Sequence, residues 1–184
     1  MDAGNQKGFT LIESLIIISI ITIMSGLALQ AIPLARSDQQ LISDTEQIRA
    51  VLLDAKERAL NQVRPDDCLP MSDMASKDRA GCSDVGIAFS GNKLIEFADT
   101  DPDNQYISNK DYTIATFDLN TTPTTDFGGS LVYTSFPPTV YLNKKGSMTA
   151  MGPAEVAKIT LISYRSLTRV LTVHPYGTID VKSL

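Results

Sequence analysis

The chain has 184 residues, of which 43% are hydrophobic and 20% are charged, and it contains no tryptophan. This composition excludes a disordered or collagen-like chain, and the length fits one domain of modest size. The formal net charge is -5, which is opposite in sign to the basic surface of a nucleic-acid-binding protein. Nucleic acid is therefore not an expected partner.

The N-terminal part of the chain is much more apolar than the rest. No Asp, Glu, Lys or Arg occurs from Ser14 to Ala35. As a helix this run would be roughly 33 Å long, which matches a bilayer hydrocarbon core of about 30 Å. We therefore predict a transmembrane or assembly helix over residues 9–35. The alternatives are a buried soluble helix, which rarely contains so long an uncharged run, and a secretory signal peptide, which should end in an A-x-A cleavage site.

A short polar leader, residues 1–8, precedes this helix. Its last two residues begin the motif Lys7-Gly8-Phe9-Thr10-Leu11-Ile12-Glu13-Ser14. The motif resembles the processing signal of type IV pilins and type II secretion pseudopilins. The resemblance implies that a prepilin peptidase cleaves after Gly8 and methylates Phe9 as the new N-terminus. It also implies that Glu13 pairs with the N-terminal ammonium of a neighbouring subunit, so that each charge offsets the desolvation of the other.

The same resemblance implies a location and a set of partners. The precursor would be a single-pass protein of the inner (cytoplasmic) membrane with an extracytoplasmic head, and the processed chain would enter a filament. The partners would be other pilin or pseudopilin subunits, the prepilin peptidase, an assembly platform protein and an assembly ATPase. The filament is a type II secretion pseudopilus, a type IV pilus or a DNA-uptake pilus, since all three share this signal and core helix.

An amphipathic helix is predicted over residues 36–64. Apolar and small side chains recur three and four positions apart, which places them on one face, at Leu41, Thr45, Ile48, Leu52, Ala55 and Ala59. Most of the charged residues between them are expected in solvent: Asp44, Glu46, Arg49, Asp54, Lys56, Glu57 and Arg58, with Asp54 and Arg58 at i,i+4 spacing. One helix would then run from Phe9 to about Asn61, with local unwinding at Gly26 or Pro33.

A polar connector follows, and it contains both cysteines of the chain, Cys68 and Cys82. In an extracytoplasmic head, two cysteines are more often a disulfide than a metal pair, because a metal site needs further ligands and the chain has a single histidine. We predict a structural disulfide, with free thiols as the alternative.

From Val85 onward the pattern changes to short strands separated by turn residues. Gly91-Asn92 joins two apolar runs as a two-residue hairpin turn. Further strands are predicted at residues 112–119, 130–136, 139–143, 158–163, 169–174 and 178–182. The predicted fold class is α+β: a long N-terminal helix, with a transmembrane half and an amphipathic half, packs on an antiparallel β-sheet head formed by residues 65–184. This is a pilin-like architecture.

An acidic loop between two predicted strands is the candidate metal site. Asp99, Asp101 and Asp103 alternate as in the opening of a calcium-binding loop, and Asp111 lies near the position of the closing ligand. The template places Gly where this chain has Asn104, and Asn also tolerates a left-handed backbone. Calcium is thus the one cofactor that the sequence suggests. The alternative is a solvated turn in which Asp and Asn bond their own backbone.

The order of motifs in the head is similar to that of the GspH/FimT group of minor pilins and pseudopilins. Three stretches carry the similarity, at residues 52–68, 140–146 and 169–181. DNA-uptake members of this group carry arginines around a C-terminal glycine, whereas Gly177 is followed here by Thr178, Ile179 and Asp180. This departure and the acidic charge argue against DNA binding.

No catalytic residue is assigned. His174 is the only histidine, and the sequence contains no nucleophile elbow, phosphate-binding loop or zinc-protease motif. We expect a non-enzymatic subunit whose function is assembly. The alternative is a membrane-anchored extracytoplasmic binding module, with calcium dependence if the acidic loop binds the ion.

Overall fold

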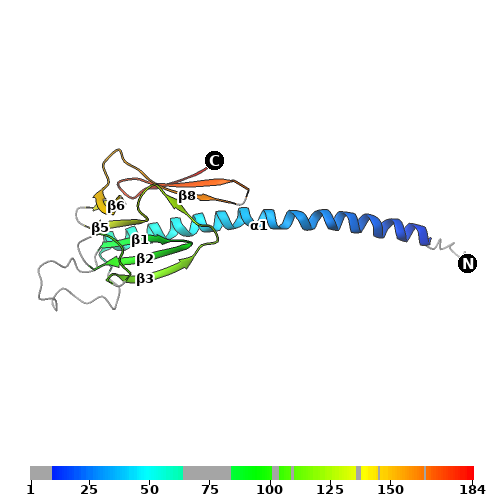
Figure 1. Cartoon of the computed structure of the whole chain (residues 1–184), viewed down its shortest axis with the longest axis horizontal. Helices are drawn as coiled ribbons and strands as arrows, with labels where there is room; N and C mark the ends of the chain where they lie inside the picture. The colour runs from blue at the N-terminus through cyan, green and yellow to red at the C-terminus, as the bar shows by residue number, and fades with distance from the viewer. Residues whose placement is uncertain are drawn as a thin grey trace, which may run out of the picture.

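The computed structural model describes residues 10–63, 84–100, 104–108, 110–135, 138–144, 146–163 and 165–184. A single long helix, α1 (Leu11–Asn61), begins the described chain. Its C-terminal half lies against the strands of the head, and its N-terminal half projects beyond them (Figure 1). The predicted long helix and β head are both present.

Helix α1 is continuous. It remains α-helical through Gly26 and Pro33, so the local unwinding predicted there does not occur. Proline removes only one backbone hydrogen bond, and the intact turns on either side hold the helical path. The helix ends where predicted, because Gln62 adopts a left-handed conformation with φ 52° and its backbone N–H returns to the carbonyls of Arg58 and Ala59.

The inner face of α1 is the one that its spacing predicts. All six positions are buried: Leu41, Thr45, Ile48, Leu52, Ala55 and Ala59. Small side chains at Ala55 and Ala59 let the helix lie close to the strands beneath it. Burying apolar surface stabilises a fold by about 25 cal/mol per Å², so this buried face stabilises the head.

The first sheet is antiparallel and begins with the predicted hairpin, β1 (Asp84–Ser90) and β2 (Lys93–Asp99). Ser90 pairs with Lys93 across the turn, and Gly91 has the positive φ of 61° that such a turn requires. The other strands are β3 (Tyr112–Asp118), β5 (Ser130–Ser135), β6 (Pro138–Lys144) and β7 (Ser147–Ala150). Within the described chain the order is β3-β2-β1-β5-β6-β7.

A second antiparallel sheet completes the predicted β head, whose number of sheets the sequence pattern did not specify. Its order among the described residues is β10-β9-β8-β4. The strands are β4 (Thr124–Thr125), β8 (Ala157–Ile162), β9 (Thr168–Val173) and β10 (Ile179–Ser183). The sequence did not reveal β4 and β7, because two and four residues are too few to show an alternating pattern.

The main core lies where α1 meets both sheets, since residues of the helix, the first sheet and the second sheet form one buried cluster. A smaller cluster covers the other face of the first sheet and includes Ala88, Ile95, Phe97 and Val132. Tyr106, from the loop after β2, packs on Phe97 with ring centroids 4.9 Å apart. Strand β2 therefore has two buried faces, and its helix-facing positions are Leu94 and Glu96.

Candidate functional site

The start of α1 carries the described part of the predicted processing and assembly site. Thr10 is the N-cap, and its hydroxyl oxygen accepts a hydrogen bond from the backbone N–H of Glu13 at 3.4 Å. Glu13 lies in the first turn, where the helix dipole favours a negative charge. The spacing T-x-x-E is a capping-box signature that sequence reasoning missed. Gly8 and Phe9 lie outside the described residues.

The projecting half of α1 is covered with exposed aliphatic side chains. Leu11 is 84% exposed, and nine more large apolar residues from Ile12 to Met24 are also exposed. The hydroxyls of Ser19 and Thr22 donate to the carbonyls of Leu15 and Ile18, each at 2.8 Å. Because these polar groups are satisfied within the helix, the surface can face an apolar environment without losing hydrogen bonds to water.

Among the described residues, no helix combines the length and the hydropathy that crossing a membrane requires. The membrane-spanning role predicted for residues 9–35 is therefore not confirmed by the structure.

Comparison with known proteins bears on this same segment. Residues 4–29 match the family model of the prokaryotic N-terminal methylation motif. The chain carries a type IV pilin-like signal. This signal indicates a type IV pilin-like protein that is processed by a prepilin peptidase and associates with other pilin subunits. The match covers Gly8, Phe9 and Glu13. No curated protein and no solved structure matches the chain.

In this pilin-like chain the acidic loop is held by one of its own carboxylates. Asp111 is 8% exposed, and its carboxylate oxygens accept the backbone N–H groups of Thr100 at 3.2 Å and Ile107 at 2.5 Å. Asn104 has a φ of 56°, the left-handed conformation anticipated for it. This geometry is that of a loop closed by side chain-to-backbone hydrogen bonds.

The loop's metal-binding capacity stays a prediction. Asp99 is buried beside this loop, whereas Asp101 and Asp103 lie outside the described residues. Within the described ranges, no group of three or more His, Cys, Asp or Glu side chains is arranged to hold a metal ion. The predicted disulfide between Cys68 and Cys82 also falls outside the described residues and stays a prediction.

Asp44 is an exception among the charged residues of the helix, most of which were expected in solvent. It is fully buried, and its carboxylate accepts hydrogen bonds from the side-chain amide of Asn120 at 2.9 Å and from the backbone N–H and hydroxyl of Thr121, each at 2.7 Å. The helix is thereby fixed to the loop after β3. Sequence spacing gave no hint of this, since the partners are more than seventy positions away.

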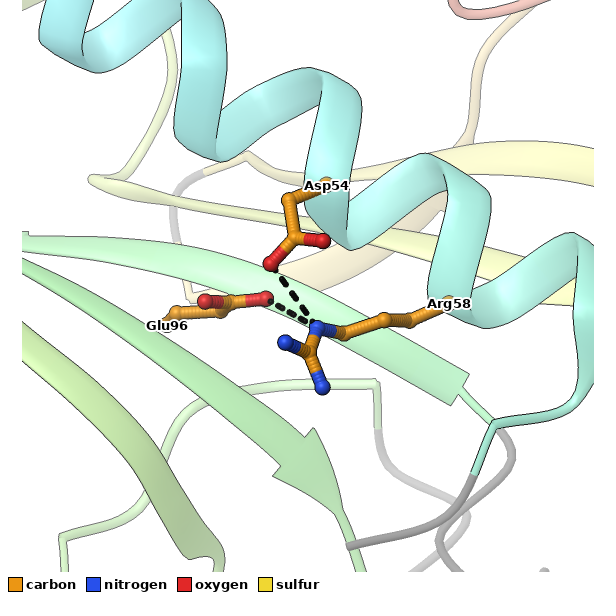
Figure 2. Close-up of polar contacts among 3 residues, drawn as sticks. All are labelled: Asp54, Arg58 and Glu96. Atoms are coloured by element: carbon orange, nitrogen blue, oxygen red, sulfur yellow. Dashed lines mark hydrogen bonds and ion pairs between the residues drawn. The ribbon is translucent and has the colours of Figure 1, made fainter.

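The pair Asp54 and Arg58 has the predicted i,i+4 contact and a third member that was not predicted. Arg58 Nε donates to Asp54 Oδ2 at 2.8 Å, and Glu96 Oε1 of β2 lies 3.3 Å from the same nitrogen. Figure 2 shows the Asp54 carboxylate from α1 and the Glu96 carboxylate from β2 reaching the same guanidinium nitrogen. Burial and the neighbouring Asp54 carboxylate raise the pKa of Glu96 to about 7, against the opposing effect of Arg58.

His174 is half-buried. Its Nε2 lies 2.9 Å from Asp180 Oδ2, across the turn between β9 and β10. In the same turn Gly177 has a φ of 69°, and Lys56 Nζ of α1 donates to the Gly177 carbonyl at 3.2 Å. A Cβ at Gly177 would lie 2.8 Å from Lys56 Cδ, so glycine lets this turn lie against the helix.

Proposed function

We propose that this protein is a minor pilin or pseudopilin subunit of the GspH/FimT type, which assembles into a type II secretion pseudopilus or a type IV pilus. The observation that carries the proposal is the methylation motif at residues 4–29, which contains the start of α1 and its exposed aliphatic side chains from Leu11 to Met24. Such a surface needs an apolar environment. Lipid supplies this environment before assembly, and the helices of neighbouring subunits supply it afterwards.

In this proposal, cleavage after Gly8 frees Phe9 as a methylated N-terminus, and the prepilin peptidase performs both reactions. Glu13 pairs with the N-terminal ammonium of a neighbouring subunit. Before assembly the chain is a single-pass inner-membrane protein, its head is extracytoplasmic, and an assembly platform protein feeds it into the filament. The role is structural, without catalysis and without nucleic acid as a partner.

Processing is the first test. We expect protein recovered from the membranes of a host with its own prepilin peptidase to begin at N-methylated Phe9, as measured by intact mass and N-terminal sequencing. A chain that keeps Met1 to Gly8, or that is cut after the apolar stretch, would contradict the proposal.

The charge pair is the second test. Glu13→Gln keeps the shape and the hydrogen-bonding capacity of the side chain at the helix start but removes its charge. A buried ammonium without its partner costs about 3–5 kcal/mol, so filament incorporation should fall at least 100-fold while processing continues. Incorporation is measured by immunoblotting of sheared filaments. Glu46→Gln, an exposed carboxylate farther along α1, is the matched control and should incorporate normally.

A binding module is the alternative function, and one feature of the head favours it. An apolar cavity of about 200 Å³ lies between the end of α1, the β5–β6 hairpin and the β9–β10 turn, and Leu60, Tyr133, Val140 and Tyr176 are among its lining residues. A monomeric binding module would need neither cleavage at Gly8 nor the charge of Glu13. If the Glu13→Gln protein keeps the function of the wild type in its host, this alternative is supported.

A further inference from the structure

We propose that Glu96, Asp54 and Arg58 form a protonation-controlled clamp between the last turns of α1 and strand β2. The contact between α1 and β2 is more stable when Glu96 is neutral, and it opens more readily when Glu96 loses its proton. This inference rests on the geometry of the head and is independent of filament assembly.

Glu96 is 2% exposed, in the middle of a strand whose neighbouring positions are also buried. The register shift between β2 and β3 places its extra residue, Ile114, on β3, so β2 keeps its alternation and Glu96 lies on the same side as Leu94. The Glu96 carboxyl group therefore faces the helix at the level of Asp54 and Arg58 (Figure 2).

The clamp contains two carboxylates and one guanidinium. Arg58 Nε has a single N–H, and Asp54 Oδ2 accepts it at 2.8 Å. Glu96 Oε1 is 3.3 Å from the same nitrogen, yet it has no hydrogen bond within the described structure. Two carboxylates beside one guanidinium leave one negative charge in excess. With neutral Glu96, the charges of Asp54 and Arg58 balance.

The strands paired with β2 place no charged residue opposite Glu96 that could offset this excess negative charge. The residues opposite Glu96 are Ile87 on β1 and Ala115 on β3, and neither is titratable. From α1 the facing charged groups are Asp54 and Arg58. The carboxyl group of neutral Glu96 can instead donate a hydrogen bond to Asp54, an interaction that favours the protonated form.

The direction of the pH dependence follows from this charge balance. The pKa of Glu96 is raised from 4.5 to about 7 in the folded head, so the folded state holds one more proton than the unfolded state between these values. The clamp is therefore strongest below pH 4.5 and weakens as the pH rises through 7. One proton of difference changes an opening equilibrium by up to about tenfold per pH unit.

The direct test is a carbon-13 NMR titration of the full chain, labelled on glutamate and held in detergent micelles. We expect the Glu96 side-chain carboxyl carbon to titrate with a midpoint near 7. Asp54→Asn removes the neighbouring negative charge and should lower this midpoint. A Glu96 midpoint at the ordinary value of 4.5, or one that Asp54→Asn leaves unchanged, would overturn the proposal.

The conformational part is tested by hydrogen exchange, read by mass spectrometry on peptides from β2 and the last turns of α1. After correction for intrinsic rates, opening in the wild-type chain should increase by up to about tenfold per pH unit between pH 5 and 7, and the increase should be absent in Glu96→Gln. His174→Gln, which changes a side chain outside the clamp, is the control and should keep the wild-type pH dependence. An equal slope in wild type and Glu96→Gln would refute the clamp.

Discussion

Asp44 illustrates how much single side chains of α1 contribute to the head. A buried carboxylate is stable only when its oxygens accept hydrogen bonds, and the carboxylate of Asp44 accepts three from Asn120 and Thr121. The helical spacing places position 44 beside the predicted apolar face, but sequence alone does not say that a distant loop supplies donors there. A charged residue on the edge of a helical face can therefore be a core residue.

Asp44→Ala is expected to destabilise the head by about 2–3 kcal/mol, because it removes a charged acceptor and leaves its donors without their partner. Urea unfolding in mild detergent, followed by circular dichroism, measures the change. Glu46→Ala, on the exposed side of the same helix, should change stability by no more than about 0.5 kcal/mol. Equal effects of the two substitutions would contradict the role assigned to Asp44.

At the scale of elements, close packing at Gly86 holds strand β1 against its two neighbouring strands, in addition to the burial of its apolar residues. A Cβ on Gly86 would lie 2.6 Å from the Leu131 carbonyl oxygen of β5 and 2.8 Å from Phe97 Cζ of β2. No side chain fits there unless the backbone moves. The sequence predicted the hairpin of β1 and β2, yet the third partner, β5, follows only after some forty intervening residues.

Gly86→Ala is accordingly expected to destabilise the head by about 2–3 kcal/mol through overpacking. Thermal unfolding monitored by circular dichroism would show a lower midpoint. Gly152→Ala is the matched control, since its nearest neighbour is 3.9 Å from the added Cβ. A wild-type midpoint for Gly86→Ala would show that the sheet accommodates the extra methyl group and would contradict this packing argument.

At the scale of the whole molecule, the chain divides into a packed head and a projecting helical half that it does not cover itself (Figure 1). Ile20, at 52% exposure, belongs to this projecting half. Substituting it should therefore leave the stability of the head unchanged and affect only what the helix contacts in other molecules or in lipid.

Ile20→Lys is expected to reduce filament incorporation about 100-fold, because a lysine in the middle of an apolar helix costs about 3 kcal/mol in a hydrocarbon environment. The head should unfold at the wild-type midpoint. Membrane fractionation and sheared-filament immunoblotting measure the two stages separately. Gln40→Lys, at an exposed position near the head, is the control. Normal incorporation of Ile20→Lys would contradict an apolar environment for this half of α1.

The sequence by itself determined the features that local patterns encode. The processing signal, the extent of α1, its buried face and the β1–β2 hairpin all follow from short-range spacing, capping and turn chemistry, and the structure or the motif match confirms them. Only the tertiary structure decided the division into two sheets, the burial of Asp44 and the meeting of Glu96 with Arg58. These depend on contacts between residues far apart in the chain, and the cost or benefit of a buried charge is set by partners that the local sequence does not specify.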